Sequence, residues 1–147
     1  MMRKRLQPDN PVEWLNRAKS SLALAKQCSR EIYSEDLCFQ AQQAAEKAIK
    51  AVYISKKIAF LYIHDISQLL AALEKEGVII PHDIKAASML TLYAAQTRYP
   101  GLEGPVSEDE YHKALVLAER VVLWAEKTLE TASLKNPHEG KNFASKQ

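Results

Sequence analysis

The chain is poor in residues that interrupt helices, since its 147 residues include only four glycines and six prolines. Long stretches rich in alanine, leucine, glutamate and lysine are left unbroken, which favours helix. No apolar run approaches the roughly 20 residues that cross a bilayer, so we expect no membrane-spanning segment. No apolar core follows the basic residues at the N-terminus, which argues against a secretory signal.

Motifs that carry chemistry are also scarce. The two cysteines, Cys28 and Cys38, form no redox or metal motif, and we expect reduced thiols in a cytoplasmic protein. The four glycines form neither a Walker motif nor a dinucleotide-binding turn, and no serine or cysteine lies in a nucleophile elbow. We therefore expect no cofactor, no metal and no catalytic residue. The histidines lack paired ligand spacing and are His64, His82, His112 and His138.

The composition is that of one soluble globular domain, with 47% hydrophobic and 26% charged residues. The net charge of +2 is weakly basic and does not by itself indicate nucleic-acid binding. We divide the chain into a basic N-terminal arm over residues 1–9, a helical domain over 10–133 and a tail over 134–147. The tail loses the apolar periodicity and is predicted to be disordered.

The apolar periodicity predicts an all-α fold, an up-and-down bundle of about five helices. Asp9 or Asn10 caps the first helix, which is expected to run to about Ser29. Ser34 is expected to cap a second helix that ends near Lys56. A loop then leads to the second half of the bundle.

The second half of the chain predicts three more helices. His64–Asp65 opens a short helix that stops at Gly77. Pro81 begins a fourth helix that is apolar over most of its circumference, so we expect it to be central. A capping box, Ser107 with Glu110, begins the last helix.

The last helix carries more apolar surface than one core face needs. A surplus apolar strip on a bundle of this size is an association site, which predicts a homodimer. The two strips are Leu115, Ala118, Val122 and Ala125, and Leu117, Val121 and Trp124.

The most informative segment is the helix over residues 39–51, which divides into two halves at 100° per residue. The polar half is either the solvated face of an ordinary bundle helix or a polar wall that lines a cleft or a subunit interface. Alanine dominates the apolar half, which lets another helix backbone come close. The apolar half is Ala41, Ala44, Ala45, Ala48, Ile49, Ala51 and Val52, and the polar half is Phe39, Gln40, Gln42, Gln43, Glu46, Lys47 and Lys50.

Arg98 is the most notable charge, because it ends an apolar helix just before a Pro-Gly break. Its guanidinium either hydrogen-bonds the last carbonyls of that helix or reaches into a cleft, where its fork suits phosphate or carboxylate. Tyr99 beside it either stacks on a base or packs under the following loop.

Together these segments resemble a known family. They are Trp14-Leu15-x-x-Ala18, Phe39-x-x-Gln42-Gln43-Ala44-Ala45-Glu46-Lys47-Ala48-Ile49-Lys50-Ala51, His64-Asp65-Ile66-x-x-Leu69-Leu70 and Arg98-Tyr99-Pro100. The resemblance is to the HEPN ("higher eukaryotes and prokaryotes nucleotide-binding") domain, over about residues 11–131. It implies a homodimeric helical bundle that binds nucleotides, partnered with a minimal nucleotidyltransferase in toxin–antitoxin-like modules.

Several HEPN proteins are ribonuclease toxins, in which an arginine is followed four to six residues later by a histidine. Arg98 matches the arginine, but the three possible histidine positions are Glu103, Gly104 and Pro105. His112 is out of register. The chain therefore resembles the Arg-Tyr-Pro branch, and we expect no ribonuclease activity.

The leading hypothesis is a non-catalytic dimer that binds a nucleotide or an RNA phosphate. Arg98 would hold phosphate, with Tyr99 beside it. Lys47 and Lys50 would add positive charge, and Gln43 would hydrogen-bond a base or sugar. Two alternatives stay open. One is a metal-independent ribonuclease in which His112 or His64 replaces the missing histidine. The other is an interaction module whose polar helix face docks a protein.

Overall fold

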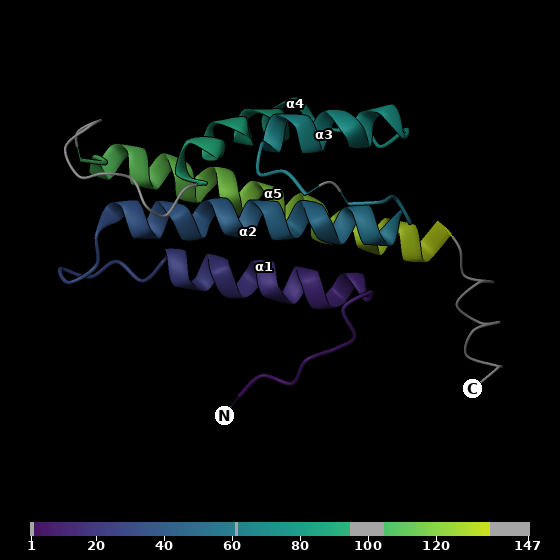
Figure 1. Ribbon diagram of the computed structural model, residues 1–147, viewed down its shortest axis with the longest axis horizontal. Coiled ribbons are helices and arrows are strands. Elements are labelled where there is room, and N and C mark those ends of the chain that lie inside the picture. The colour runs from purple at the N-terminus through teal and green to yellow at the C-terminus, as the bar shows by residue number, and fades with distance from the viewer. Residues whose placement is uncertain (1, 61, 95–104, 136–147) are drawn as a thin grey trace.

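The computed structural model describes residues 2–60, 62–94 and 105–135. Three long helices run side by side along the molecule, and the shorter ones lie over one face of them (Figure 1). The described residues contain helices and loops and no strand, which confirms the all-α prediction. The elements are α1 (Pro11–Ala25), α2 (Ser34–Ser55), α3 (Ile66–Lys75), α4 (His82–Lys85), the 3₁₀ helix η1 (Ala86–Tyr93) and α5 (Glu108–Lys135).

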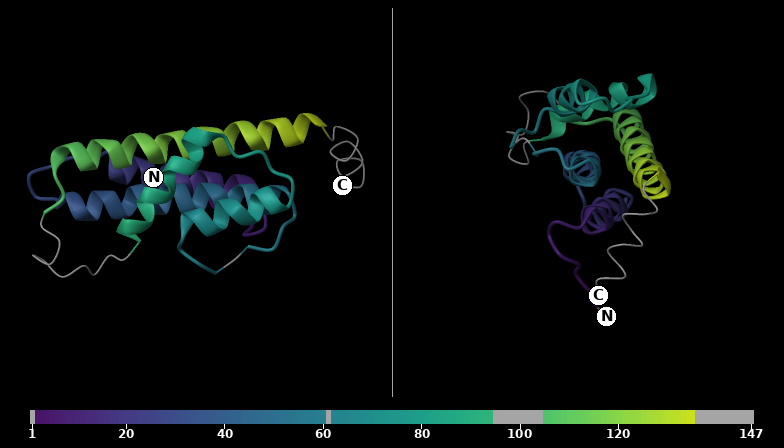
Figure 2. Two further views of the ribbon diagram at one scale, coloured as in Figure 1. Left: turned by 90° about the horizontal axis from the view of Figure 1, so that it is seen from above. Right: turned by 90° about the vertical axis from the view of Figure 1, so that its right-hand side faces the viewer.

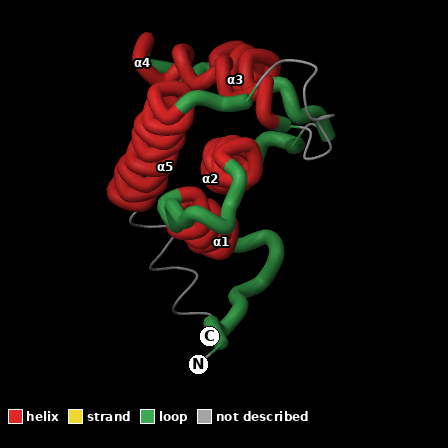
Figure 3. The backbone as a smooth tube through the Cα atoms, turned by 90° about the vertical axis from the view of Figure 1, so that its left-hand side faces the viewer, coloured by secondary structure: helices red, strands yellow, loops and turns green. Residues whose placement is uncertain are grey.

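Helix α2 is the centre of the bundle and packs against α1, α5, η1 and α3. The view along the bundle shows α2 between α1 and the layer that holds α3 and α4, with α5 alongside (Figures 2 and 3). Small alanine side chains let α1 and α5 approach the α2 backbone closely. The predicted apolar half is confirmed, because all its members are fully buried: Ala41, Ala44, Ala45, Ala48, Ile49, Ala51 and Val52.

The predicted helix ends are largely confirmed. The Asn10 side chain accepts a hydrogen bond from the Val12 amide at 2.9 Å, which caps α1. In the capping box, the Glu110 amide donates to Ser107 Oγ at 3.1 Å. Gly77 follows α3 with a φ of 91°, a left-handed conformation that glycine adopts without strain.

Two helix limits were predicted wrongly. Helix α1 ends at Ala25 and not near Ser29. The Tyr111 hydroxyl donates to the Ala25 carbonyl oxygen at 2.6 Å, so this buried contact satisfies the end of the helix without another turn. Ser34 is the first residue of α2 and not its cap. Tyr33 occupies the cap position without a side-chain hydrogen bond.

The expectation of a central fourth helix was wrong. The segment forms the short α4 and then η1 at the edge of the bundle, and Leu92 is 63% exposed. In a 3₁₀ helix, residues three apart lie on one face. The buried residues follow that spacing and are Ile84, Ala87, Leu90 and Tyr93. Met89 and Leu92 on η1 are left exposed, while Thr91 Oγ1 accepts a hydrogen bond from the Ile66 amide at the start of α3.

Helix α5 buries most of both predicted apolar strips within a single chain, so the strips themselves provide no surplus surface. Its contacts explain this, because it packs against α2 and α1 as well as against α4 and η1. Among the α5 side chains that the structure describes, the large apolar ones left exposed are Val116 and Leu123, which belong to neither strip.

A larger side chain on the alanine face of α2 is expected to destabilise the bundle. Ala48→Leu would force the helix backbones apart and lower the free energy of unfolding by about 1–3 kcal/mol. Chemical denaturation followed by circular dichroism measures the change. Ala71→Leu is the matched control, because Ala71 is exposed on α3. Equal effects of the two substitutions would contradict the close packing around α2.

Candidate anion-binding site on helix α2

The polar half of α2 is not a solvated face. No residue from 37 to 55 is exposed, and Gln42 is fully buried. Helix α1 contacts this half through Trp14 and Ser21, and Phe60 in the α2–α3 loop lies near Lys50. The structure therefore agrees with a polar wall that other segments partly cover.

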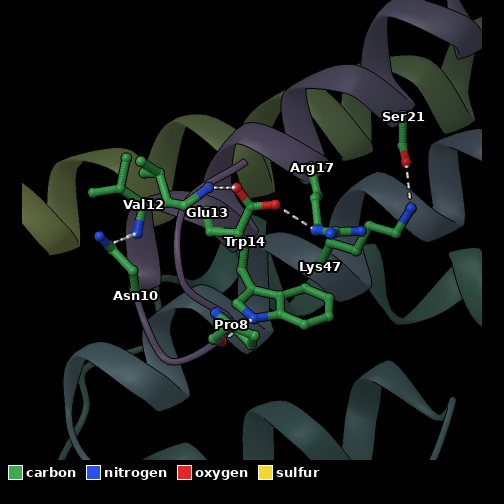
Figure 4. Close-up of polar contacts among 9 residues, drawn as sticks. Pro8, Asn10, Val12, Glu13, Trp14, Arg17, Ser21 and Lys47 are labelled. Carbon is green, nitrogen blue, oxygen red and sulfur yellow. Dashed lines mark hydrogen bonds and ion pairs between the residues drawn. The ribbon is translucent and has the colours of Figure 1, made fainter. Parts of the chain in front are cut away.

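One stripe of α1 supplies polar groups to this wall. Glu13, Arg17 and Ser21 are four residues apart and follow one another along one side of the helix (Figure 4). Arg17 Nε donates to Glu13 Oε2 at 2.6 Å, and the Leu6 amide donates to Glu13 Oε1 at 2.9 Å. The Leu6 hydrogen bond is the main cause that lowers the pKa of Glu13. The N-terminal arm is thereby attached to α1.

Lys47 crosses from α2 to α1 and donates to Ser21 Oγ at 2.9 Å. In Figure 4 its side chain lies beside that of Arg17. Burial lowers the pKa of Lys47, and the charge of Arg17 lowers it further, while Glu46 opposes both. Two cations are thus held close together in a partly buried position, and Glu13 and Glu46 offset part of their charge.

Lys50 lies in an aromatic cage. Its Nζ is 3.8 Å from the ring centre of Trp14 and 4.8 Å from that of Phe60. Arg17 is also over the Trp14 ring, at 5.4 Å from Cζ to the centroid. Cation–π contacts stabilise an ammonium without neutralising it, so the cage orients Lys50 and keeps its charge. Trp14 is itself fixed by a hydrogen bond from Nε1 to the Pro8 carbonyl oxygen at 2.7 Å.

Gln43 is half-buried beside these cations. Its Nε2 donates to Gln42 Oε1 at 2.8 Å. Gln42 in turn donates to Glu46, which is also bonded to His64. One N–H of the Gln43 amide is therefore used, which leaves its second N–H and its carbonyl oxygen to offer to a base or sugar.

The structure brings together three of the five predicted site residues, namely Gln43, Lys47 and Lys50. Arg98 and Tyr99 lie outside the described residues. Their contribution to a common cleft with Lys47 stays a prediction.

Sequence reasoning missed Trp14 and Arg17 as members of the site. A signal for them was present, since Glu13, Arg17 and Ser21 repeat at a spacing of four on the helix next to α2. Interpreting that signal requires knowing which face of α1 packs against α2, and periodicity alone does not show this.

The structure also describes His112 and the two cysteines, which were considered from the sequence. His112 is exposed on α5 and stacks on Tyr111, with 5.2 Å between the ring centres. Cys28 and Cys38 are not joined in a disulfide. Within the described ranges, no group of three histidine, cysteine or acidic residues is arranged to hold a metal. In the same part of the chain, no helix combines the length and apolar character needed to span a membrane.

The fold and the polar wall define an all-α helical bundle with a half-buried cationic site. A model of the HEPN domain matches residues 12–128, and the chain belongs to the HEPN family. TT1696 from Thermus thermophilus has a similar structure, with a TM-score of 0.68 and 30% identity over 82% of this chain and 98% of that one. ST0689, described as an archaeal HEPN homologue, gives a TM-score of 0.66 and 25% identity over 86% and 99%. No curated protein matches the chain.

A half-buried cation beside a second cation is expected to reduce stability. Lys47→Met removes the desolvated charge, and we expect it to raise the free energy of unfolding by up to about 1 kcal/mol at neutral pH. The pKa of Lys47 is lowered in the fold, so the penalty is complete below that lowered value and vanishes above the ordinary value for lysine. The gain from methionine should therefore shrink as the pH rises into the alkaline range.

Denaturation curves of both proteins across this pH range measure the effect. Lys75→Met is the matched control, since Lys75 is exposed on α3. A destabilised Lys47→Met protein would show that the ammonium contributes more to the fold than its burial costs.

Proposed function

We propose that this HEPN protein binds a nucleotide or an RNA phosphate at the polar wall of α2. In this proposal it acts in the cytoplasm as a homodimer with a minimal nucleotidyltransferase partner, in a toxin–antitoxin-like module. The observation that carries the binding proposal is the set of three cations, Arg17, Lys47 and Lys50, which α1 and α2 hold together in a partly desolvated setting. The family membership supports the same ligand class.

The acidic residues of the polar wall determine how strongly we expect a ligand to bind. Glu13 and Glu46 offset two of the three positive charges, so the site has a small net charge. Binding should then depend on directed hydrogen bonds more than on a general field, and each charge-assisted contact contributes about 1.5–3 kcal/mol. An interaction with one or a few phosphates fits this balance better than tracking along a long nucleic acid.

Loss of one cation is expected to weaken binding by about tenfold to a hundredfold. Calorimetric titration of ATP and of a short single-stranded RNA into wild type, Lys47→Met and Arg98→Ala measures this loss. Lys75→Met serves again as the control and should bind as wild type does.

Two results would contradict the proposal. One is the absence of binding to either ligand at sub-millimolar concentration, which would favour the interaction module. The other is unchanged affinity in Lys47→Met, which would show that the ligand binds away from α2. Unchanged affinity in Arg98→Ala alone would remove Arg98 from the site.

The homodimer is supported by apolar surface on the other side of the molecule. A groove of about 630 Å³ lies between α5, the end of α2 and the segment before α4. Ile79 and Leu123 line it and are largely exposed. Cations and acids also line it, and a two-fold axis would set the cations of one copy against the acids of the other. These residues are Lys56, Arg120 and Lys127, and Glu76 and Asp83.

A charge in the middle of this groove is expected to separate the dimer. Leu123→Asp should turn a particle of twice the chain mass into a monomer, as measured by light scattering. Leu24→Asp is the matched control, because Leu24 on α1 is 49% exposed and Leu123 is 51% exposed. A monomeric wild type would contradict the dimer, and a dimeric Leu123→Asp would contradict the groove as its interface.

The ribonuclease alternative has one observation in its favour, since the His64 ring lies within hydrogen-bonding distance of Glu46 on the polar wall. His112 is not part of the polar wall, because it lies on α5. Cleavage of RNA by the pure protein, lost in His64→Ala, would replace the non-catalytic proposal. Failure of a co-expressed minimal nucleotidyltransferase to co-purify would remove that partner.

A further inference from the structure

A chain of hydrogen bonds runs across the polar wall and ends at a histidine. Gln43 donates to Gln42 at 2.8 Å, Gln42 Nε2 donates to Glu46 Oε1 at 3.3 Å, and His64 Nδ1 lies 2.7 Å from the same oxygen. Burial of an amide is costly unless both its ends are bonded. The fully buried Gln42 meets this condition, so it fixes the Glu46 carboxylate, and the carboxylate fixes the ring of His64.

Glu46 holds the His64 ring on one side, and the other side of the ring is exposed. The Glu46 side chain is only 13% exposed, whereas that of His64 is 70% exposed. Because Nδ1–H donates to the carboxylate, Nε2 is the ring nitrogen that is left to face a ligand. It accepts a hydrogen bond in the neutral ring and donates one in the imidazolium.

The position of this ring connects it with the cations already described. The charge of Glu46 acts on both Lys47 and Lys50, so the three charged groups occupy one part of α2. Phe60, four residues before His64, lies against Lys50. The α2–α3 loop thus supplies a polar group to the same wall from the side opposite to α1.

We propose that His64 is a phosphate-binding residue of this site and that it binds as imidazolium, with Nε2–H donating to a phosphate oxygen. This inference rests on the proposed nucleotide or RNA binding. A hydrogen bond from a charged donor is about twice as strong as one from a neutral donor. Affinity for a phosphate should therefore increase as the pH falls through the range in which histidines titrate.

The other ionisable groups of the wall and of the loop belong to types whose ordinary pKa values lie outside that range. They are Glu46, Lys47 and Lys50 on α2, Glu13 and Arg17 on α1, and Tyr62 and Asp65 in the loop. Carboxylates titrate at lower pH, and amines, guanidinium groups and phenols at higher pH. Terminal phosphates do titrate near pH 6, so the probe must carry phosphodiesters alone.

Calorimetric titration of a short oligouridylate with hydroxyl groups at both ends tests the inference, at about pH 6 and about pH 8. Wild type is expected to bind about five- to tenfold more tightly at the lower pH. His64→Gln should lose this difference and keep the wild-type affinity of the higher pH. His82→Gln, a change of an exposed histidine on α4, should keep the difference.

The outcomes separate this inference from the proposed function. If no oligouridylate binds at either pH, this inference is wrong, and the proposed function is wrong as well only if ATP does not bind either. If wild type binds equally at the two pH values, or if His64→Gln keeps the difference, the site stands and His64 is not part of it. Circular dichroism of each variant tests whether the substitution leaves the helices intact.

Discussion

Close contact between helix backbones across the alanine face of α2 is the constraint on which the rest of the structure depends. Alanine allows that approach because no larger side chain keeps the helices apart, and the whole face is fully buried. The close approach of α1 also affects the polar half of α2. It brings Trp14, Arg17 and Ser21 onto Lys47 and Lys50. The packing that stabilises the bundle therefore also desolvates its cations.

That desolvation distinguishes a site from an ordinary surface. Exposed lysines are hydrated and contribute little in either direction. Here Lys47 is half-buried beside another cation, and a buried glutamine is committed to holding a carboxylate. The first arrangement is unfavourable in isolation, and the second is satisfied only because both ends of the Gln42 amide are bonded. The acids of the wall compensate enough for the fold to form.

The sequence predicted the all-α fold, the alanine face and most helix ends, because these follow from local preference and periodicity. Prediction from the sequence failed where contacts between distant parts of the chain determine the local structure. The end of α1 depends on Tyr111, 86 residues away. The fourth helix was misjudged because burial at intervals of three fits both a broad α-helical face and a 3₁₀ helix. Lys47 and Lys50 were predicted from their spacing on one helix. Predicting Arg17 and the Glu46–His64 contact would have required knowing which faces of neighbouring segments pack together.

The attachment of the N-terminal arm has a kinetic consequence. The hydrogen bonds from Leu6 to Glu13 and from Trp14 to Pro8 fix the point at which the arm leaves α1. Arg5 in the exposed arm thereby stays close enough to Glu13 for its charge to help lower the pKa of that carboxyl. If the proposed anion binding holds, charges placed in this way act at a distance of about one Debye length, roughly 8–10 Å, and attract the anion before any contact forms. Their effect falls on the association rate and its dependence on salt, and leaves dissociation to the residues of the wall.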